Sequence, residues 1–364
     1  MKILSLFDGI SIAQQAFKEL GYEVEYYASE IDKNAIQVTQ KNHPNTEQLG
    51  DIKDIDCTGG KLHYGKGKLA ETDIYILIGG SPCQDLSIAK KNREGLSGKR
   101  SGLFWEYVRI LKELKPKYFI LENVASMSKE AKQTITDTLW GIEPVMINAS
   151  LVSAQNRKRL FWIGKLVGDK YERVEISQPE DKGIFLKDIL EENVDEKYFT
   201  TMDFTKRFDY TIHEEPYGKK TQALRATDYK GTHNTIRIGQ IGKGGQGDRI
   251  YSPEGKSVNL SANGGGRGAK TGLYLTWGVA NRTRNGKKQI EHNGLEKANA
   301  MTSVQTDSMV DVGNVIRRLT PIECERLQSL PDNYTEGISN TQRYKALGNG
   351  FNCSVIKHIL ENIL

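Results

Sequence analysis

The feature that most constrains the fold is the regular alternation of short apolar runs with amphipathic stretches over the first 165 residues. Residues 2–7 have the pattern of a buried strand, and residues 12–20 have that of a helix that ends before Gly21. Strands that alternate with helices are typical of an α/β domain with a mostly parallel sheet. Further strands are predicted at residues 24–29, 74–78, 118–121, 145–149 and 160–163, and further helices at residues 103–114, 129–140, 321–330 and 353–364.

Residues 201–300 differ in composition from the rest of the chain. They contain 17 Lys and Arg against 9 Asp and Glu, and 16 of the 36 glycines, although the whole chain has a net charge of only +5. Positive charge on a glycine-rich, polar segment suits a surface that faces phosphates. A solvated, loop-rich insertion would have the same composition, so this observation alone leaves both interpretations open.

The same block contains three short segments with one shared pattern, at residues 220–226, 256–262 and 297–303. The pattern is Lys, two residues, a small or amide residue, Leu or Met, one residue, and Ala or Ser. A possible short strand follows each segment, which we interpret as three related β units. Six arginines of this block could read guanine edges or grip phosphates: Arg225, Arg237, Arg249, Arg267, Arg282 and Arg284.

Length and cysteine content exclude several classes of protein. A chain of 364 residues favours two units, or one large core with an insertion. No apolar run approaches the ~18 residues that cross a bilayer, and no apolar leader follows Met1, so we expect a cytoplasmic protein without a membrane partner. The four cysteines are scattered and form no CxxC pair, so neither a disulfide scaffold nor a metal site is expected.

Two strand ends carry the signs of a nucleotide site. The turn after the first predicted strand reads LFDGIS at residues 6–11, and the second predicted strand ends in EID at residues 30–32. Gly9 would let the backbone approach a ligand, and Glu30 could hold a ribose diol. The turn lacks GxGxxG, so a dinucleotide is disfavoured. Taken alone, each of these carboxylates would more often be a helix cap or a surface residue.

A cysteine follows the strand predicted at residues 74–78, within the sequence GGSPCQDLS. On a rigid Pro-Cys turn at the carboxyl end of a strand, Cys83 is positioned to act as a nucleophile. A buried, inert cysteine is the ordinary alternative. Residues 84–102 contain five Lys and Arg and three Gly, so they could close over a nucleic acid or remain a solvated loop.

Several motifs around this cysteine resemble those of the C5-cytosine DNA methyltransferases. The ordered set is highly specific and extends over about residues 1–165 and 316–364. In chain order the motifs are FDGIS, GGSPCQDLS, LENV, QNRKR, RRLTPIECERLQSLPD and GNG, the last at residues 348–350.

This resemblance implies a fold, a reaction and partners. The implied fold is a Rossmann-like S-adenosylmethionine-dependent methyltransferase domain at residues 1–174, a smaller β-rich target-recognition domain at residues 175–335, and a segment at residues 336–364 that completes the catalytic domain. The implied reaction transfers the methyl group of S-adenosylmethionine to C5 of a cytosine flipped out of double-stranded DNA, with S-adenosylhomocysteine as the product. We expect a monomer, and a restriction endonuclease with the same target would be a separate protein.

The resemblance also assigns roles to single residues. Cys83 matches the nucleophile that attacks C6, Glu122 the carboxyl group at N3, and Arg157 and Arg159 the arginines near the base and the cysteine. The family often has a further glycine where this chain has Ser11-Ile12. The cofactor-binding positions match Phe7, Asp8, Gly9, Ile10, Ile12, Glu30, Ile31, Asp51, Ile52, Pro82, Leu103 and Asn349.

Three functions are alternatives to DNA cytosine methylation. An RNA cytosine methyltransferase is the nearest, because one branch of the family modifies tRNA with the same motifs, and the long basic insertion argues against it. A catalytically silent DNA-binding module is disfavoured, since Cys83 and Glu122 are both present. A nicotinamide oxidoreductase is disfavoured by the missing GxGxxG.

Overall fold

The chain divides into two compact units in the computed structural model. Unit 1 comprises Met1–Ser153, Arg157–Gly183 and Glu325–Leu364, and unit 2 comprises Ala154–Asn156 and Ile184–Cys324. The functional boundaries expected at 174/175 and 335/336 stay a prediction. The structure describes residues 1–64, 68–70, 73–81, 103–198, 237–240, 249–251, 253, 255–260, 273–276, 278–284, 287–293 and 315–364.

An eight-stranded sheet forms the centre of unit 1, with strand order β10-β9-β7-β6-β1-β2-β3 and β8 paired to β9. Neighbours among β1, β2, β3, β6 and β7 pair in parallel, whereas β9 runs antiparallel to β7, β8 and β10. The prediction of a mostly parallel sheet is confirmed. The strands are β1 (Lys2–Leu6), β2 (Glu25–Ser29), β3 (Glu47–Gln48), β6 (Ile74–Gly80), β7 (Tyr118–Val124), β8 (Val145–Asn148), β9 (Lys158–Val167) and β10 (Lys170–Arg173), and β4 (Leu62–Tyr64) pairs with β5 (Lys68–Ala70) in a separate hairpin.

Apolar periodicity located several helices of the chain correctly. The helix α3 has the predicted bounds and buries Phe104, Tyr107 and Leu111, and α1 ends before Gly21, whose φ of 79° is in the left-handed region. The α-helices are α1 (Ile12–Glu19), α2 (Lys33–Asn42), α3 (Leu103–Leu114), α4 (Lys129–Thr138), α5 (Pro321–Leu327), α6 (Asn340–Asn349) and α7 (Cys353–Ile363), and the 3-10 helices are η1 (Ile52–Asp54), η2 (Thr58–Gly60), η4 (Ala149–Leu151), η5 (Leu186–Ile189) and η6 (Glu196–Tyr198).

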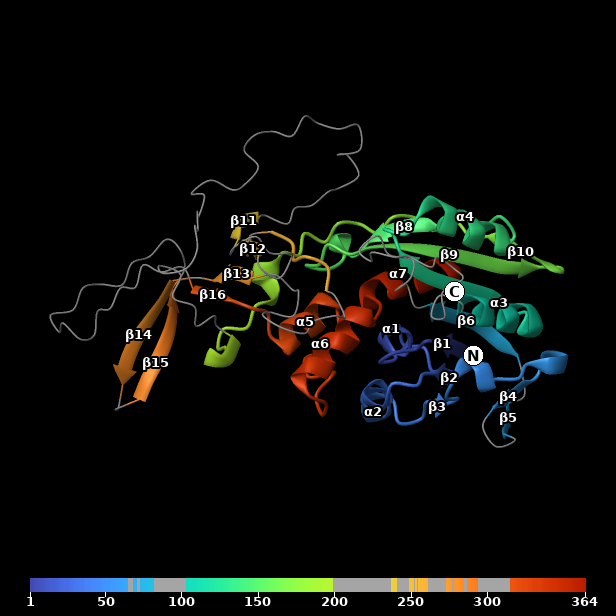
Figure 1. Cartoon of the computed structure of the whole chain (residues 1–364), viewed down its shortest axis with the longest axis horizontal. Helices are drawn as coiled ribbons and strands as arrows, with labels where there is room; N and C mark the ends of the chain where they lie inside the picture. The colour runs from blue at the N-terminus through green and yellow to red at the C-terminus, as the bar shows by residue number, and fades with distance from the viewer. Residues whose placement is uncertain are drawn as a thin grey trace, which may run out of the picture. The chain divides into compact units, whose positions relative to one another are not determined.

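The two ends of the chain meet in unit 1. The last helix, α7, packs along α1, and both are visible beside the sheet in Figure 1. Lys357 of α7 forms an ion pair with Glu19 of α1, at 2.9 Å. The C-terminal segment is therefore an integral part of the unit that contains the first strand. None of the helices in the described ranges is long and apolar enough to cross a membrane.

Unit 2 contains a four-stranded sheet with the order β11-β12-β13-β16 and a hairpin of β14 and β15. The segments at residues 220–226 and 297–303 lie outside the described residues, as do Arg225 and Arg267. Arg237, Arg249, Arg282 and Arg284 lie on strands. The strands are β11 (Arg237–Gln240), β12 (Arg249–Tyr251), β13 (Leu273–Thr276), β14 (Gly278–Arg284), β15 (Lys287–Asn293) and β16 (Val315–Arg317).

Candidate active site

A pocket of about 370 Å³ opens in unit 1 at the carboxyl ends of β1, β2, β6 and β7. This is the edge where open α/β sheets bind ligands, and the volume suits a ligand of nucleoside size. Segments from both ends of the chain contribute to its wall. The lining includes Phe7, Asp8, Gly9, Glu30, Ile31, Asp32, Asp51, Ile52, Leu103, Glu122, Arg157, Arg159, Lys345, Asn349 and Phe351.

Glu30 lies at the end of β2, with its carboxylate held by the backbone. Its Oε1 accepts hydrogen bonds from the N–H groups of Ile31 and Asp32, at 2.7 and 2.8 Å, and its Oε2 accepts one from the N–H of Gly9, at 2.8 Å. An ionised carboxylate has about four acceptor positions, so three N–H donors leave capacity for a ligand hydroxyl. The position and the remaining acceptor capacity fit the expected contact with a ribose.

Two further residues complete this end of the pocket. Asp51 is the N-cap of η1 and accepts a hydrogen bond from the N–H of Lys53 at 3.1 Å, so it serves as a helix cap and also lines the pocket. Ile31 lines the pocket with a side chain that is 70% exposed. An apolar side chain so exposed at a pocket wall is available to cover a flat, apolar ligand surface.

An ion pair joins the rim of the pocket to the C-terminal segment. Lys345 of α6 lies 2.6 Å from Asp32, which also caps α2 through the N–H of Asn34. The hydrogen bond from Lys345 lowers the pKa of the Asp32 carboxyl below its ordinary value. The sequence analysis did not identify Lys345, because nothing in the sequence around Lys345 indicates that it pairs with Asp32.

Glu122 and Arg159 face each other at the other end of the pocket. Arg159 Nε lies 2.7 Å from Glu122 Oε1, and the two side chains are 13% and 14% exposed. Gly80, at the end of β6, pairs with Glu122 in the sheet, and a Cβ there would lie 3.0 Å from Glu122 Oε2. Glycine therefore gives the Glu122 carboxyl room beside the strand that leads toward Cys83.

Arg157, which resembles a residue near the base in sequence, supports the closing motif in the structure. Its Nη2 donates to the carbonyl oxygens of Gly348 and Gly350, at 3.2 and 2.7 Å, and its side chain is buried. These two carbonyls flank Asn349, which lines the pocket. The guanidinium of Arg157 thus holds the turn that contains Asn349. The sequence does not reveal that these two residues are neighbours.

Asn123 is a second residue that sequence reasoning missed. It is buried, and its Nδ2 donates to the hydroxyl of Ser81 at 3.1 Å. Ser81 is the first residue after β6 and begins the SPCQ sequence. The position of Asn123 between Glu122 and Val124 in LENV was the available signal.

The predicted site residues fall into three groups by placement. Glu122, Arg157, Arg159 and nine of the twelve cofactor positions line the pocket: Phe7, Asp8, Gly9, Glu30, Ile31, Asp51, Ile52, Leu103 and Asn349. Ile10 and Ile12 are buried in the core, at 0% and 1% exposure, so their role as cofactor contacts stays a prediction. Cys83, Pro82 and residues 84–102 lie outside the described residues.

The cysteines that the structure describes have the properties of inert thiols. Cys57, Cys324 and Cys353 are all buried. Burial, with a contribution from Glu113, raises the pKa of the Cys57 thiol to about 12, and burial raises that of Cys353 further still. A thiol with so high a pKa is a poor nucleophile near neutral pH.

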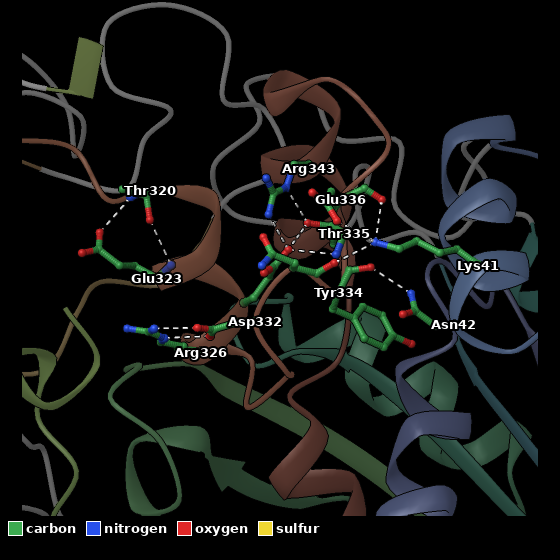
Figure 2. A network of polar contacts seen from close by, with 12 residues as sticks. Lys41, Asn42, Thr320, Glu323, Arg326, Asp332, Tyr334, Thr335, Glu336 and Arg343 are labelled. Carbon is green, nitrogen blue, oxygen red and sulfur yellow. Dashed lines mark hydrogen bonds and ion pairs between the residues drawn. The ribbon is translucent and has the colours of Figure 1, made fainter. Parts of the chain in front are cut away.

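A loop of the C-terminal segment supports the turn at residues 7–11 from behind the pocket. The Tyr334 hydroxyl donates to the carbonyl of Ile10 at 2.9 Å, and Asn42 donates to the carbonyl of Tyr334 at 2.8 Å. Lys41 donates to the carbonyl of Glu336 at 3.1 Å. Figure 2 shows the contacts that Lys41 and Asn42 of α2 make with this loop.

The fold and the pocket define an α/β protein with a pocket of nucleoside size at the carboxyl edge of its sheet and a Glu–Arg pair at the far end of that pocket. The model of the C-5 cytosine-specific DNA methylases matches residues 1–364. The chain belongs to this family and is a DNA (cytosine-5-)-methyltransferase.

Named relatives agree with this family, and a solved structure agrees with the fold. The orphan methyltransferase M.SPRI of Bacillus phage SPR is 28% identical, over all of this chain and 97% of its own length. The type II methyltransferase M.HhaI of Haemophilus parahaemolyticus is also 28% identical, over all of this chain and 94% of its own. The structure of the Entamoeba histolytica methyltransferase EhMeth has a similar fold, with a TM-score of 0.64, 16% identity, and coverage of 100% of this chain and 97% of that one.

Proposed function

We propose that the chain methylates C5 of a cytosine flipped out of double-stranded DNA, with S-adenosylmethionine as the donor and Cys83 as the nucleophile. The observation that carries the proposal is the shared pocket. A backbone-held carboxylate, Glu30, lies at one end, and the Glu122–Arg159 pair lies at the other, beside the strand that leads into SPCQ.

The residues at the first end fit S-adenosylmethionine, which supplies an electrophilic methyl group when bound. Glu30 would accept hydrogen bonds from the ribose hydroxyls, and Asp51 and Ile52 would contact the adenine. Phe7, Gly9, Leu103 and Asn349 line the same space. Pro82, Ile10 and Ile12 are carried over from the family's motifs alone.

The residues at the second end fit the covalent chemistry. The Cys83 thiolate would add its electron pair to C6 of the cytosine, which leaves C5 electron-rich, and C5 would then form a bond to the methyl carbon as the donor sulfur keeps the old bonding pair. A base would remove the C5 proton, the C5–C6 double bond would form again, and the thiolate would leave. Glu122, in its protonated form, would donate a hydrogen bond to N3 and so offset the negative charge that develops in the ring when the thiolate adds.

Arg159 would hold Glu122 in place until the base enters. The two side chains are largely buried, so their attraction is only weakly screened by water. Because one Arg159 nitrogen lies 2.7 Å from Glu122, the base must fit beside an already paired carboxylate. We infer that this contact rearranges when N3 approaches.

The choice of target would belong to residues 175–335 and, within them, to the block at residues 222–311. Its charge and its arginines support contact with DNA phosphates and base edges. Exchange of residues 175–335 for those of a relative with another target should transfer the target. An RNA substrate is the alternative, and an assay of methyl transfer to transcribed RNA tests it.

Covalent trapping is the direct experiment for this function. Bisulfite sequencing of DNA treated with the purified protein identifies the target cytosine. A second duplex is then made with 5-fluorocytosine in place of that cytosine. The wild type should form a covalent complex, because no C5 proton can leave, whereas Cys83→Ala should form none and still bind S-adenosylmethionine. A trapped complex with Cys83→Ala would contradict the mechanism.

A further inference from the structure

The turn at residues 7–11 has an unusual backbone for a segment with one glycine. Phe7, Gly9 and Ser11 have φ angles of 57°, 64° and 55°. Six non-glycine residues in the described part of the chain have a positive φ, and two of them lie in this turn. Left-handed backbone is unfavourable for a residue with a Cβ, so the surrounding contacts must stabilise it here.

Ser11 has a set of buried partners that can do so. Its hydroxyl donates to Asp8 Oδ2, and the hydroxyl of Thr39 on α2 lies 3.0 Å away. Tyr26 on β2 donates to Asp8 Oδ1 at 2.8 Å. These four side chains are between 0% and 6% exposed, so water does not compete for their hydrogen bonds.

The Asp8 carboxyl is the centre of this cluster. The backbone N–H of Asp8 also donates to the carbonyl of Ser29 at 3.1 Å, which connects the turn to β2. Burial raises the pKa of Asp8 above its ordinary value, and the hydrogen bonds from Ser11 and Tyr26 oppose that rise. Both donors therefore stabilise the ionised carboxylate that accepts them.

We propose that Asp8 and Ser11 act as a pair of positioning residues for the cofactor. The carboxylate, fixed by Tyr26, holds the Ser11 hydroxyl, so a non-glycine residue keeps the left-handed conformation at the end of the turn. The same turn carries Phe7, Asp8 and Gly9, which line the pocket. This inference rests on the proposed binding of S-adenosylmethionine. It gives Asp8 a role through the turn, whereas the family resemblance implies a direct contact.

The physical consequence is a population effect. Without the hydroxyl, a residue with a Cβ at position 11 should leave the left-handed region part of the time, and the pocket would then be incomplete. The apparent affinity falls in proportion to the fraction of molecules in the competent conformation. Glycine at position 11 adopts this conformation without the same steric cost and needs no hydroxyl.

A comparison of Ser11→Ala with Ser11→Gly in the full chain tests the proposal. Both variants lack the hydroxyl, and neither changes the charge of the site. Ser11→Ala should raise the dissociation constant for S-adenosylmethionine by about tenfold, and Ser11→Gly by less than about threefold. Calorimetry measures both constants, and the KM for DNA should stay unchanged. Equal losses of affinity in the two variants would overturn the proposal.

Asp8 is tested through its coupling to position 11. Asp8→Asn should weaken binding by about tenfold in the wild type and by clearly less in Ser11→Gly, because the glycine no longer depends on the carboxylate. Tyr26→Phe serves the same purpose if Asp8→Asn does not fold. Equal effects in both backgrounds would contradict the coupling between the two residues.

A buried control separates positioning from general stability. Thr136 accepts a hydrogen bond from Trp162 Nε1 at 3.0 Å, away from the pocket lining. Thr136→Val should lower the melting temperature and leave the cofactor affinity unchanged. If the wild type does not bind S-adenosylmethionine, the proposed function is wrong. If the wild type binds it but Ser11→Ala and Ser11→Gly lose the same affinity, only this inference is wrong.

Discussion

The two ends of the pocket hold their carboxylates by different means. Glu30 is held by three backbone N–H groups, whose positions follow from the turn and from the ends of β1 and β2. Glu122 is held by one charged side chain, Arg159, at 2.7 Å. The backbone donors can move only if the turn or the chain after β2 changes conformation, whereas Arg159 can change partners by rotation of its side chain.

The difference corresponds to what each end is proposed to do. A site that binds the same nucleoside in every cycle gains from donors fixed before the ligand arrives. A site where a base enters, reacts and leaves needs a carboxylate that can exchange partners. We therefore expect substitutions at the first end to change binding and substitutions at the second end to change turnover.

The largest effect is expected at Glu122. Glu122→Gln keeps the shape but cannot accept or donate a proton as a carboxyl group does, so kcat should fall by about 10² to 10⁴-fold. The affinity for S-adenosylmethionine should stay within about twofold of wild type, because general acid–base groups act on the reacting base. Rates of methyl transfer and calorimetry measure the two quantities.

A matched ion pair provides the control for Glu122. Glu113 pairs with Arg109 at 3.0 Å on α3, outside the pocket lining. Glu113→Gln should leave kcat unchanged. If Glu122→Gln turned over at the wild-type rate, the assignment of the second end to chemistry would be wrong.

The next effect in size is expected at Glu30. Glu30→Ala removes a charged acceptor, which should weaken S-adenosylmethionine binding by about 1 to 3 kcal/mol. The value of kcat at saturating cofactor should change little. The exposed Glu23, on the segment before β2, supplies the control Glu23→Ala, and unchanged affinity in Glu30→Ala would refute the ribose contact.

Acid should lower the stability of the fold through His43, the residue that follows α2. Burial, with Lys18 nearby, lowers the pKa of His43 to about 4. Since the unfolded pKa is near 6.5, the unfolded state binds more protons between these values, and stability falls as the pH drops through that window. At pH 5.5 the loss should be on the order of 1 kcal/mol.

Thermal unfolding at pH 7 and pH 5.5 measures this loss. His43→Gln should remove this part of the pH dependence, whereas His358→Gln, on α7, should retain it. Identical pH dependence in wild type and His43→Gln would contradict the assignment.

The smallest effect is expected at Tyr334. Tyr334→Phe removes the donor to the Ile10 carbonyl, at a cost of about 0.5 to 1.5 kcal/mol in stability. Because Ile10 lies in the turn that lines the pocket, the KM for S-adenosylmethionine should also rise, by about two- to fivefold. Tyr171 donates to the carbonyl of Pro116 at 2.6 Å, so Tyr171→Phe should cost similar stability without any change in this KM.

The sequence indicated the elements with strong apolar periodicity and the residues at their ends. Residues 103–114 form α3 with the predicted bounds, whereas β6 extends beyond the predicted residues 74–78 and includes Gly79 and Gly80. The helices α2 and α6 were not predicted, because each buries only three residues among many polar ones. Apolar spacing indicates a helix only where the helix buries a continuous face.

Glu122 and Arg159 could be identified from the sequence, because each belongs to a motif that resembles the family, and Glu30 could be identified because it follows the second predicted strand. Their partners could not. Arg157 holds the carbonyls of Gly348 and Gly350, and Lys345 pairs with Asp32 across 313 positions of the chain. Local patterns determine which segments become strands and helices, but the partner of a polar side chain depends on which distant segment the fold brings within about 3 Å of it.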